Sequence, residues 1–308
     1  MRVAVVDIGT NSTRLLIADV EPTGEIAELE RRTRVTRLGD GVDASGRLSE
    51  AGIGRVLDAL AEYAEAIERH GAQARPAVLT SAVRDAANGP EFVSEIERRF
   101  DLQARIIAGG EEARLTFLGA TSDRDPADTT PTLVIDVGGG STELIVGSGH
   151  EVDFSVSMQA GVVRQSERHL HDDPPSCAEL DALGAEVAAT IARSVPQEVR
   201  RRATQAIAVA GTATSAAAID QALEPYDAAR VHGYPVSLAT LRLLLARLAA
   251  VDLDERRTIR GLHPDRAPTI VAGIVILIAV LEAFGLGGFE ASEHDILRGV
   301  ALTAAGAA

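Results

Sequence analysis

One order of apolar and polar residues occurs twice along the chain. An apolar run around Asp7 leads into a turn with Gly9, and an apolar run around Asp136 leads into a turn with Gly138. Each turn is followed by another apolar run, which is the pattern of a β-hairpin. The two aspartates are 136 − 7 = 129 residues apart, about one domain length. The sequence therefore predicts a duplicated fold whose two copies each contain such a hairpin.

Capping residues and apolar periodicity predict the helices. Ser49 precedes an amphipathic segment that runs to about His70, and Gly71 ends it, as N-cap and C-cap residues do. The same criteria predict helices at about 90–100, 109–122, 159–170, 176–194, 212–221, 237–250, 264–284 and 294–306, and strands at 76–81, 103–107, 150–157 and 205–210. This mixture of strands and helices indicates an α/β fold.

The length of the chain indicates two domains. A chain of 308 residues exceeds what one hydrophobic core usually supports. The segment 122–131 contains three aspartates and two prolines, lies between the two copies of the pattern, and is typical of a surface loop or linker. The most apolar stretch, 270–281, has twelve uncharged residues, whereas a bilayer span needs roughly 20. We therefore expect a buried helix there.

Composition narrows the classes of partner. Aromatic residues make up 3% and there is no Trp, so we expect no stacking surface for nucleic acid. The net charge of −15 repels polyanions, so a phosphate-rich substrate would need local arginines and backbone amides. Arginines cluster at 31–37, 98–99 and 200–202, although such clusters are more often solvated faces. A single cysteine, Cys177, and a start without a leader pattern predict a cytoplasmic protein without membrane contact. The choice between monomer and homodimer stays open.

Three segments rich in glycine, serine and threonine are candidates for binding phosphate. Glycine lets a backbone amide approach an anion closely, and hydroxyl groups add further donors. Two of the segments follow an apolar run that contains an aspartate, and the third follows the apolar run 206–210. The candidate residues are Gly9, Thr10, Asn11 and Ser12; Gly138, Gly139, Gly140, Ser141 and Thr142; and Gly211, Thr212, Ala213 and Thr214.

Carboxylates beside the first two turns indicate a metal ion. A carboxylate and a phosphate repel each other, so Asp7 and Asp136 next to phosphate-binding turns imply a cation between acid and substrate. Mg²⁺ is the natural candidate because it accepts few protein ligands and keeps several waters, and Glu143 could reach it through one of them. The alternative is that both aspartates only accept amide hydrogen bonds within their own turns.

Hydrolysis also needs a group that activates water and cations that stabilise the transferred phosphoryl group. Glu111 and Glu112 lie in the first turn of the helix predicted at 109–122, where at roughly 100° per residue only one can face a site. Acidic residues there also complement the helix dipole, which is the alternative explanation. Arg14 and Arg84 are the candidate cations, although isolated arginines more often form surface salt bridges.

The order of these segments resembles the exopolyphosphatase and guanosine pentaphosphate phosphohydrolase family. The matching segments are 6–12, 80–84, 110–115, 135–143 and the turn at Gly211, so the resemblance covers essentially the whole chain. It implies two ribonuclease H-like domains of the actin, sugar-kinase and chaperone-ATPase superfamily. It also implies an active site in the cleft between the domains, with Mg²⁺ as the cofactor.

The resemblance further implies roles for individual residues. Glu112, rather than Glu111, would be the catalytic base. Asp136 and Glu143 would organise the metal and the water, and Asp7 would assist as a metal ligand. The three turns together with Arg84 would hold phosphates.

The expected domain boundaries also follow from the resemblance. Because the last helix of the family often folds back onto the first domain, we expect an N-terminal actin-like domain of residues 1–120 plus about 292–308, and a second actin-like domain of residues 121–291. The chain resembles the short form, which lacks the C-terminal helical module. The family segment Ser-x-x-Gly-Leu-Arg-Glu-Gly is Ser-Glu-His-Asp-Ile-Leu-Arg-Gly at 292–299 here, so the roles of its Arg and Glu are not carried over.

The expected reaction is hydrolysis of the terminal phosphoanhydride of inorganic polyphosphate, with Glu112 orienting or deprotonating water. Guanosine pentaphosphate, a nucleotide of the stringent response, is the first alternative substrate. The scarcity of aromatic residues that could stack on its base favours inorganic polyphosphate. A small-molecule kinase would share the fold, but the Glu112 segment suits attack by water and no adenosine-binding stretch is recognised. A sensor that binds polyphosphate or an alarmone without turnover would need nearly the same turns.

Overall fold

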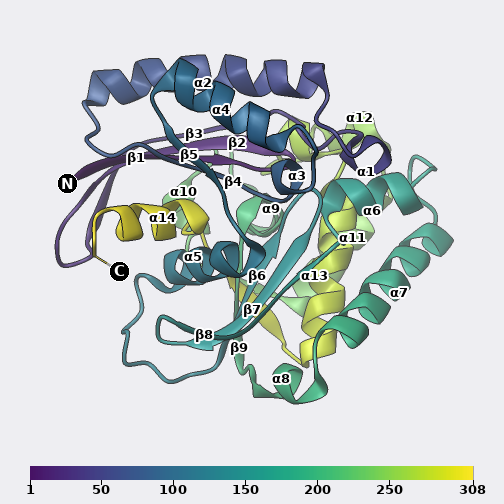
Figure 1. Cartoon of the computed structure of the whole chain (residues 1–308). Coiled ribbons are helices and arrows are strands. Elements are labelled where there is room, and N and C mark those ends of the chain that lie inside the picture. The colour runs from purple at the N-terminus through teal and green to yellow at the C-terminus, as the bar shows by residue number, and fades with distance from the viewer. Residues whose placement is uncertain (308) are drawn as a thin grey trace. The chain divides into compact units, whose positions relative to one another are not determined.

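The computed structural model describes residues 1–307, and the chain divides into two compact units (Figure 1). Unit 1 comprises Met1–Asp123 and the chain from Asp295 on, and unit 2 comprises Arg124–His294. Each unit contains one mixed β-sheet with helices. The chain therefore builds part of unit 1, then all of unit 2, and returns to unit 1 with its last helix.

Unit 1 contains a five-stranded sheet with the order β3-β2-β1-β4-β5. Strands β1 to β3 are antiparallel, whereas β4 and β5 run parallel to β1. Every residue of β1 after Arg2 is buried, because helices cover both faces of the sheet, and this explains its continuous apolar sequence. The strands are β1 Arg2–Ile8, β2 Ser12–Val20, β3 Ile26–Val35, β4 Pro76–Leu79 and β5 Gln103–Ile106.

Alternating residues of β1 face the two helix layers of unit 1. Ala4 and Val6 pack in one hydrophobic cluster with α2 and α4, and Val3 and Val5 pack in another with α5 and α14. Figure 1 shows α2 and α4 on one side of these strands, with α5 and α14 on the other. The helices are α1 Val42–Ser45, α2 Glu50–His70, α3 Ser81–Arg84, α4 Gly89–Phe100, α5 Gly109–Thr121 and α14 Ile296–Ala304.

Helices α5 and α14 touch through two glycines. A Cβ atom at Gly299 would lie 1.9 Å from the carbonyl oxygen of Leu115, and one at Gly119 would lie 1.9 Å from the carbonyl oxygen of Asp295. The atoms that would be struck belong to the backbone, so they cannot move aside as a flexible side chain can. The close approach of the two helices therefore depends on both glycines.

We expect Gly299→Ala to lower the free energy of unfolding by about 1–3 kcal/mol, the usual cost of overpacking a core. The matched control is Gly54→Ala in α2, where nothing lies within 4 Å of an added Cβ. That change should raise stability by about 0.5–1 kcal/mol, because alanine favours a helix over glycine. Urea unfolding followed by circular dichroism compares the three proteins. A Gly299→Ala protein as stable as the wild type would contradict the importance of this contact.

Unit 2 contains a six-stranded sheet with the order β10-β11-β9-β6-β7-β8. Strands β6, β7 and β8 are antiparallel, β9 runs parallel to β6 and β11 to β9, and β10 pairs antiparallel with β11. Without β10, this sheet repeats the order and directions of the sheet in unit 1. The prediction of a duplicated, ribonuclease H-like α/β fold is therefore confirmed. The strands are β6 Thr132–Val137, β7 Thr142–Ser148, β8 Glu151–Met158, β9 Gln205–Val209, β10 Pro235–Ser237 and β11 Gly288–Ala291.

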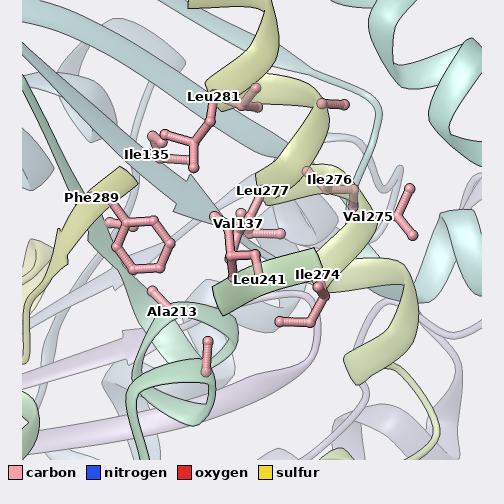
Figure 2. Packing of buried hydrophobic residues seen from close by; sticks show 14 of the residues in the cluster. Ile135, Val137, Ala213, Leu241, Ile274, Val275, Ile276, Leu277, Leu281 and Phe289 are labelled. Atoms are coloured by element: carbon pink, nitrogen blue, oxygen red, sulfur yellow. The ribbon is translucent and has the colours of Figure 1, made fainter. Parts of the chain in front are cut away.

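The core of unit 2 forms between its sheet and the apolar helix α13. Figure 2 shows Ile135 of β6 close to Leu281 of α13, with Val137 beside Leu277, and all four belong to one buried cluster. Within residues 1–307 no helix has both the length and the apolarity to cross a bilayer. The helices are α6 Val162–His169, α7 Cys177–Ser194, α8 Gln197–Arg202, α9 Ala210–Asp220, α10 Ala228–Val231, α11 Leu238–Ala249, α12 Leu253–Arg256, the 3₁₀ helix η1 Pro264–Arg266 and α13 Ile270–Phe284.

Most predicted elements are confirmed with small shifts at their ends, two predicted helices need correction, and several short elements and β3 were not predicted. The single helix expected at 264–284 is a 3₁₀ turn followed by α13, because Pro268 lacks the amide that a continuous helix needs. The helix expected at 159–170 begins only at Val162, since the amides of Val162 and Val163 donate to Gly138 and Gly139 rather than to carbonyls four residues earlier in the chain. Strand β3 was not predicted because half of its residues are charged, which hides the alternation of an edge strand.

Candidate functional site

The first predicted turn joins β1 to β2. The amide of Gly9 donates to the carbonyl of Ser12 at 3.0 Å, and the hydroxyls of Thr10 and Ser81 are hydrogen-bonded at 3.0 Å. Among residues 1–307, no backbone carbonyl accepts from the amides of Thr10 or Asn11. These amides are therefore donors that an anion could use, as the sequence predicts for this turn.

Asp7 and Arg14 are cross-strand partners in this hairpin. Arg14 donates from Nε and Nη2 to Oδ2 of Asp7 at 2.9 and 2.6 Å, and from Nη1 to Oδ2 of Asp295. Asp7 is buried, and its Oδ1 has no hydrogen-bond partner in the described part of the chain. Burial raises the pKa of Asp7, although Arg14 acts in the opposite direction. Arg14, a predicted phosphate ligand, thus has three bonds to carboxylates.

Glu112 is the more buried of the two adjacent glutamates on α5. Its Oε2 accepts from Nη1 of Arg84 at 3.2 Å, and the same nitrogen donates to the carbonyl of Ile107 at 3.0 Å. The side chain of Glu112 is 12% exposed, whereas Glu111 is 35% exposed and pairs with Arg105. Burial raises the pKa of Glu112, and Arg84 opposes this shift. The two carboxylates of this turn therefore have different surroundings.

The second predicted turn joins β6 to β7 and rests on the start of α6. The amide of Gly138 donates to the carbonyl of Ser141 at 2.9 Å, and the amides of Val162 and Val163 donate to the carbonyls of Gly138 and Gly139, both at 2.9 Å. The carbonyls of this turn are thereby occupied by the helix. In the described residues, the amides of Gly139 and Ser141 donate to no backbone carbonyl, so this turn can also offer donors to an anion.

Asp136 and Glu143 are directly opposite each other in the β6–β7 hairpin. Opposed side chains in an antiparallel pair have Cβ atoms about 4.5–5.5 Å apart, and two like charges there cost free energy that a divalent cation would offset. Glu143 is buried, and its Oε1 accepts from the hydroxyl of Ser157 at 2.7 Å. The hydroxyl of Thr142 donates to the carbonyl of Ala160, so it contributes to the fold rather than pointing to an anion.

The third predicted turn is the beginning of helix α9 rather than a separate turn. Ala210 adopts a positive φ of 62° at the junction with β9, and Ala213 is fully buried in the core shown in Figure 2. Only the backbone of Ala213 could therefore contact a phosphate. The first amides of a helix have no partner within the helix, so this segment still offers anion donors.

Arg266 is a candidate residue that the sequence did not reveal. A Cβ atom on Gly211 would lie 1.4 Å from Nη1 of Arg266, so the guanidinium lies directly on the glycine at the start of α9. A cation at this position would strengthen anion binding by the helix terminus. The two residues are far apart in the sequence, and only the absence of a side chain at Gly211 hints at a close neighbour.

A cavity of about 490 Å³ in unit 2 was also not predicted. It is lined by residues 223–224, Tyr226 and residues 257–264, which include Arg257 and Arg260. Tyr226 is 50% exposed, and Thr214 and Arg266 are among the groups that influence its pKa, which burial raises. Gly261 of the lining lies against the carbonyl oxygen of Ala218, so the cavity lies beside α9.

Within unit 1, the structure gathers four of the predicted site residues into one cluster: Asp7, Arg14, Arg84 and Glu112. The charges of Asp7 and Arg14 both act on the pKa of Glu112. Within unit 2, it pairs Asp136 with Glu143 beside the second turn. Carboxylate oxygens are the ligands that Mg²⁺ prefers, and the buried, unpartnered Oδ1 of Asp7 fits a bound cation or one of its waters.

Each unit thus carries a hairpin with an aspartate and with a turn whose amides could bind an anion. A model of the Ppx/GppA phosphatase family matches residues 16–305. The chain belongs to the Ppx/GppA phosphatase family, which confirms the resemblance found in the sequence. As a member of a phosphatase family, it is a hydrolase.

Individual relatives agree with this assignment. The chain is 39% identical to exopolyphosphatase 2 of Mycobacterium tuberculosis over 99% of both chains. It is 30% identical to the guanosine-5'-triphosphate,3'-diphosphate pyrophosphatase of Aeromonas hydrophila, over 96% of this chain and 58% of that protein. The crystal structure of an exopolyphosphatase from Cytophaga hutchinsonii matches with a TM-score of 0.89 at 27% identity, over 99% and 98% of the two chains. The Ppx/GppA family member of Aquifex aeolicus matches with a TM-score of 0.84 at 30% identity, over 98% and 97%.

Proposed function

We propose that this protein is an exopolyphosphatase, which hydrolyses the terminal phosphoanhydride of inorganic polyphosphate and releases orthophosphate. The observation that carries the proposal is the environment of Glu112, a buried carboxylate bonded to Arg84 within electrostatic reach of Asp7. Full-length similarity to exopolyphosphatase 2 supports the choice of substrate. A carboxylate placed in this way suits activation of water, as a hydrolase requires.

In this mechanism, Glu112 accepts a proton from the attacking water or orients it toward the terminal phosphorus. Arg84 holds the Glu112 carboxylate in place and supplies positive charge near the phosphoryl group. In unit 1 the amides of the turn at Gly9 would donate to phosphate oxygens, and in unit 2 the turn at Gly138 and the start of α9 with Arg266 offer donors of the same kind. Charge that develops on these oxygens is thereby stabilised by groups that need no reorganisation.

Mg²⁺ is the cofactor in this proposal. Asp136 and Glu143 would hold it, because they present two carboxylates on one face of a hairpin. In unit 1, Oδ1 of Asp7, the oxygen that Arg14 does not contact, would be a Mg²⁺ ligand of the same kind. When bound, the ion neutralises phosphate charge and polarises the bond to be broken.

The test is a phosphate-release assay with long polyphosphate, short polyphosphate and guanosine pentaphosphate, each with Mg²⁺ and with excess EDTA. We expect release from polyphosphate that stops in EDTA and returns when Mg²⁺ is restored. Tight binding of polyphosphate without release would instead indicate a sensor. Transfer of labelled phosphate from ATP to a small acceptor would indicate a kinase.

Guanosine pentaphosphate is the second candidate substrate, and the cavity lined by Tyr226, Arg257 and Arg260 favours it. Tyr226 could stack on a base, and Arg257 and Arg260 could donate to its acceptor atoms, which an inorganic chain does not need. The 30% identity to a guanosine-5'-triphosphate,3'-diphosphate pyrophosphatase agrees with this candidate. Faster release from guanosine pentaphosphate than from either polyphosphate in the same assay would favour it.

We also propose that the protein works in the cytoplasm. Its single cysteine, Cys177, is exposed and forms no disulfide, which suits a reducing compartment. Fractionation of cells that express the tagged full chain would test this location.

A further inference from the structure

Asp295 contacts the cluster in unit 1 from the far end of the sequence. Its Oδ2 accepts from Nη1 of Arg14, a residue 281 positions away, and its Oδ1 accepts from the amide of Leu297 at 3.0 Å. The side chain is 5% exposed. Its carbonyl oxygen also rests against Gly119 of α5, the helix that carries Glu112. Three contacts thus fix Asp295 in place, and one of them is with Arg14, the residue that also binds Asp7.

The bonds of Arg14 are not those that a guanidinium and a single carboxylate usually form. An isolated pair prefers two parallel bonds, one to each carboxylate oxygen. Here Nε and Nη2 of Arg14 both donate to Oδ2 of Asp7, while Nη1 donates to Asp295. As a result, Oδ1 of Asp7 is buried without a hydrogen-bond partner among the described residues. Asp295 competes with Asp7 for the same guanidinium.

We propose that Asp295 is a positioning residue for the phosphatase reaction. By binding Nη1 of Arg14, it keeps the guanidinium from pairing with both oxygens of Asp7, so Oδ1 of Asp7 stays available to Mg²⁺ or its water. Without this carboxylate, Arg14 turns toward Asp7 and covers Oδ1. The inference rests on the proposed function for its substrate and its ion.

The test uses Asp295→Asn and Asp295→Ser in the full chain. Both residues cap a helix about as well as aspartate, so α14 keeps its N-cap while the charge that holds Arg14 is lost. We expect the midpoint of thermal unfolding to change little. Loss of a group that orients a metal ligand typically costs about 10–100-fold. We therefore expect at least a tenfold lower kcat, a KM for polyphosphate within about twofold of wild type, and weaker Mg²⁺ binding by calorimetry.

A double-mutant cycle shows whether Asp295 acts through Arg14. Because the effect of Asp295 requires Arg14, Arg14→Met combined with Asp295→Asn should have the kcat of Arg14→Met alone. Losses that add fully would overturn the proposal, as would Asp295→Asn and Asp295→Ser proteins with wild-type kcat and wild-type Mg²⁺ affinity. If wild-type protein releases no phosphate, the proposed function fails. In that case the Mg²⁺ affinities of wild type and Asp295→Asn still decide the role of Asp295.

Discussion

Glu112→Gln should reduce the rate of phosphate release by about 100-fold or more, with little change in the affinity for polyphosphate. Glutamine keeps the size of the side chain and can still accept from Arg84, but it cannot take a proton from water. Initial rates and KM for long polyphosphate, measured with saturating Mg²⁺, would show a loss confined to kcat. Retained turnover would reject Glu112 as the base.

The matched control is Glu111→Gln on the same turn of α5. Glu111 is more exposed and pairs with Arg105 at the surface, so this variant should keep wild-type activity. Stability gives a second comparison. Because burial raises the pKa of Glu112, the folded state holds that proton more tightly than the unfolded state, and the ionised form lowers stability at neutral pH. Glu112→Gln should therefore be at least as stable as the wild type, so lost activity would not reflect unfolding.

Asp136→Asn should likewise lower phosphate release by about 100-fold or more, because the metal would lose one of its two facing carboxylates. The same variant should lose most of the rise in melting temperature that Mg²⁺ gives the wild type, since that rise depends on binding to the folded state. Thermal unfolding with and without Mg²⁺ measures this effect independently of turnover.

Glu151→Gln is the matched control for Asp136→Asn. Glu151 lies on β8 of the same sheet but is exposed, so its loss should leave both activity and the Mg²⁺ effect unchanged. An Asp136→Asn protein whose melting temperature still rises with Mg²⁺ as in the wild type would move the metal away from this hairpin.

The repeated hairpins could be predicted because their signal is local. An apolar run, an aspartate and a glycine turn are adjacent in the sequence, and their physical cause is the burial of a strand that ends at a tight turn. The same holds for α2, whose N-cap Ser49 and C-cap Gly71 stand where they were expected. Candidate residues that offer backbone amides to an anion were therefore the most accessible to sequence reasoning.

The partners of those residues could not be predicted, because tertiary contacts decide them. Arg14 looked like a phosphate ligand beside the first turn, yet it binds Asp7 and Asp295, and the second of these comes from the other end of the chain. Nothing in the sequence indicates that Arg266 lies against Gly211. Helical geometry alone showed only that Glu111 and Glu112 differ. The choice of Glu112 came from family resemblance, and the structure adds that Glu112 is the one bonded to Arg84.

The return of α14 to unit 1 affects the order in which the protein can fold during synthesis. Domains generally fold as units while the ribosome elongates the chain, usually from the N-terminus. Here one hydrophobic cluster of unit 1 includes Ile296, Leu297 and Val300, which are made only after all of Arg124–His294. The nascent first segment therefore has this face of its sheet covered only in part, by α5, until unit 2 has been made. Unit 1 is therefore completed only after unit 2.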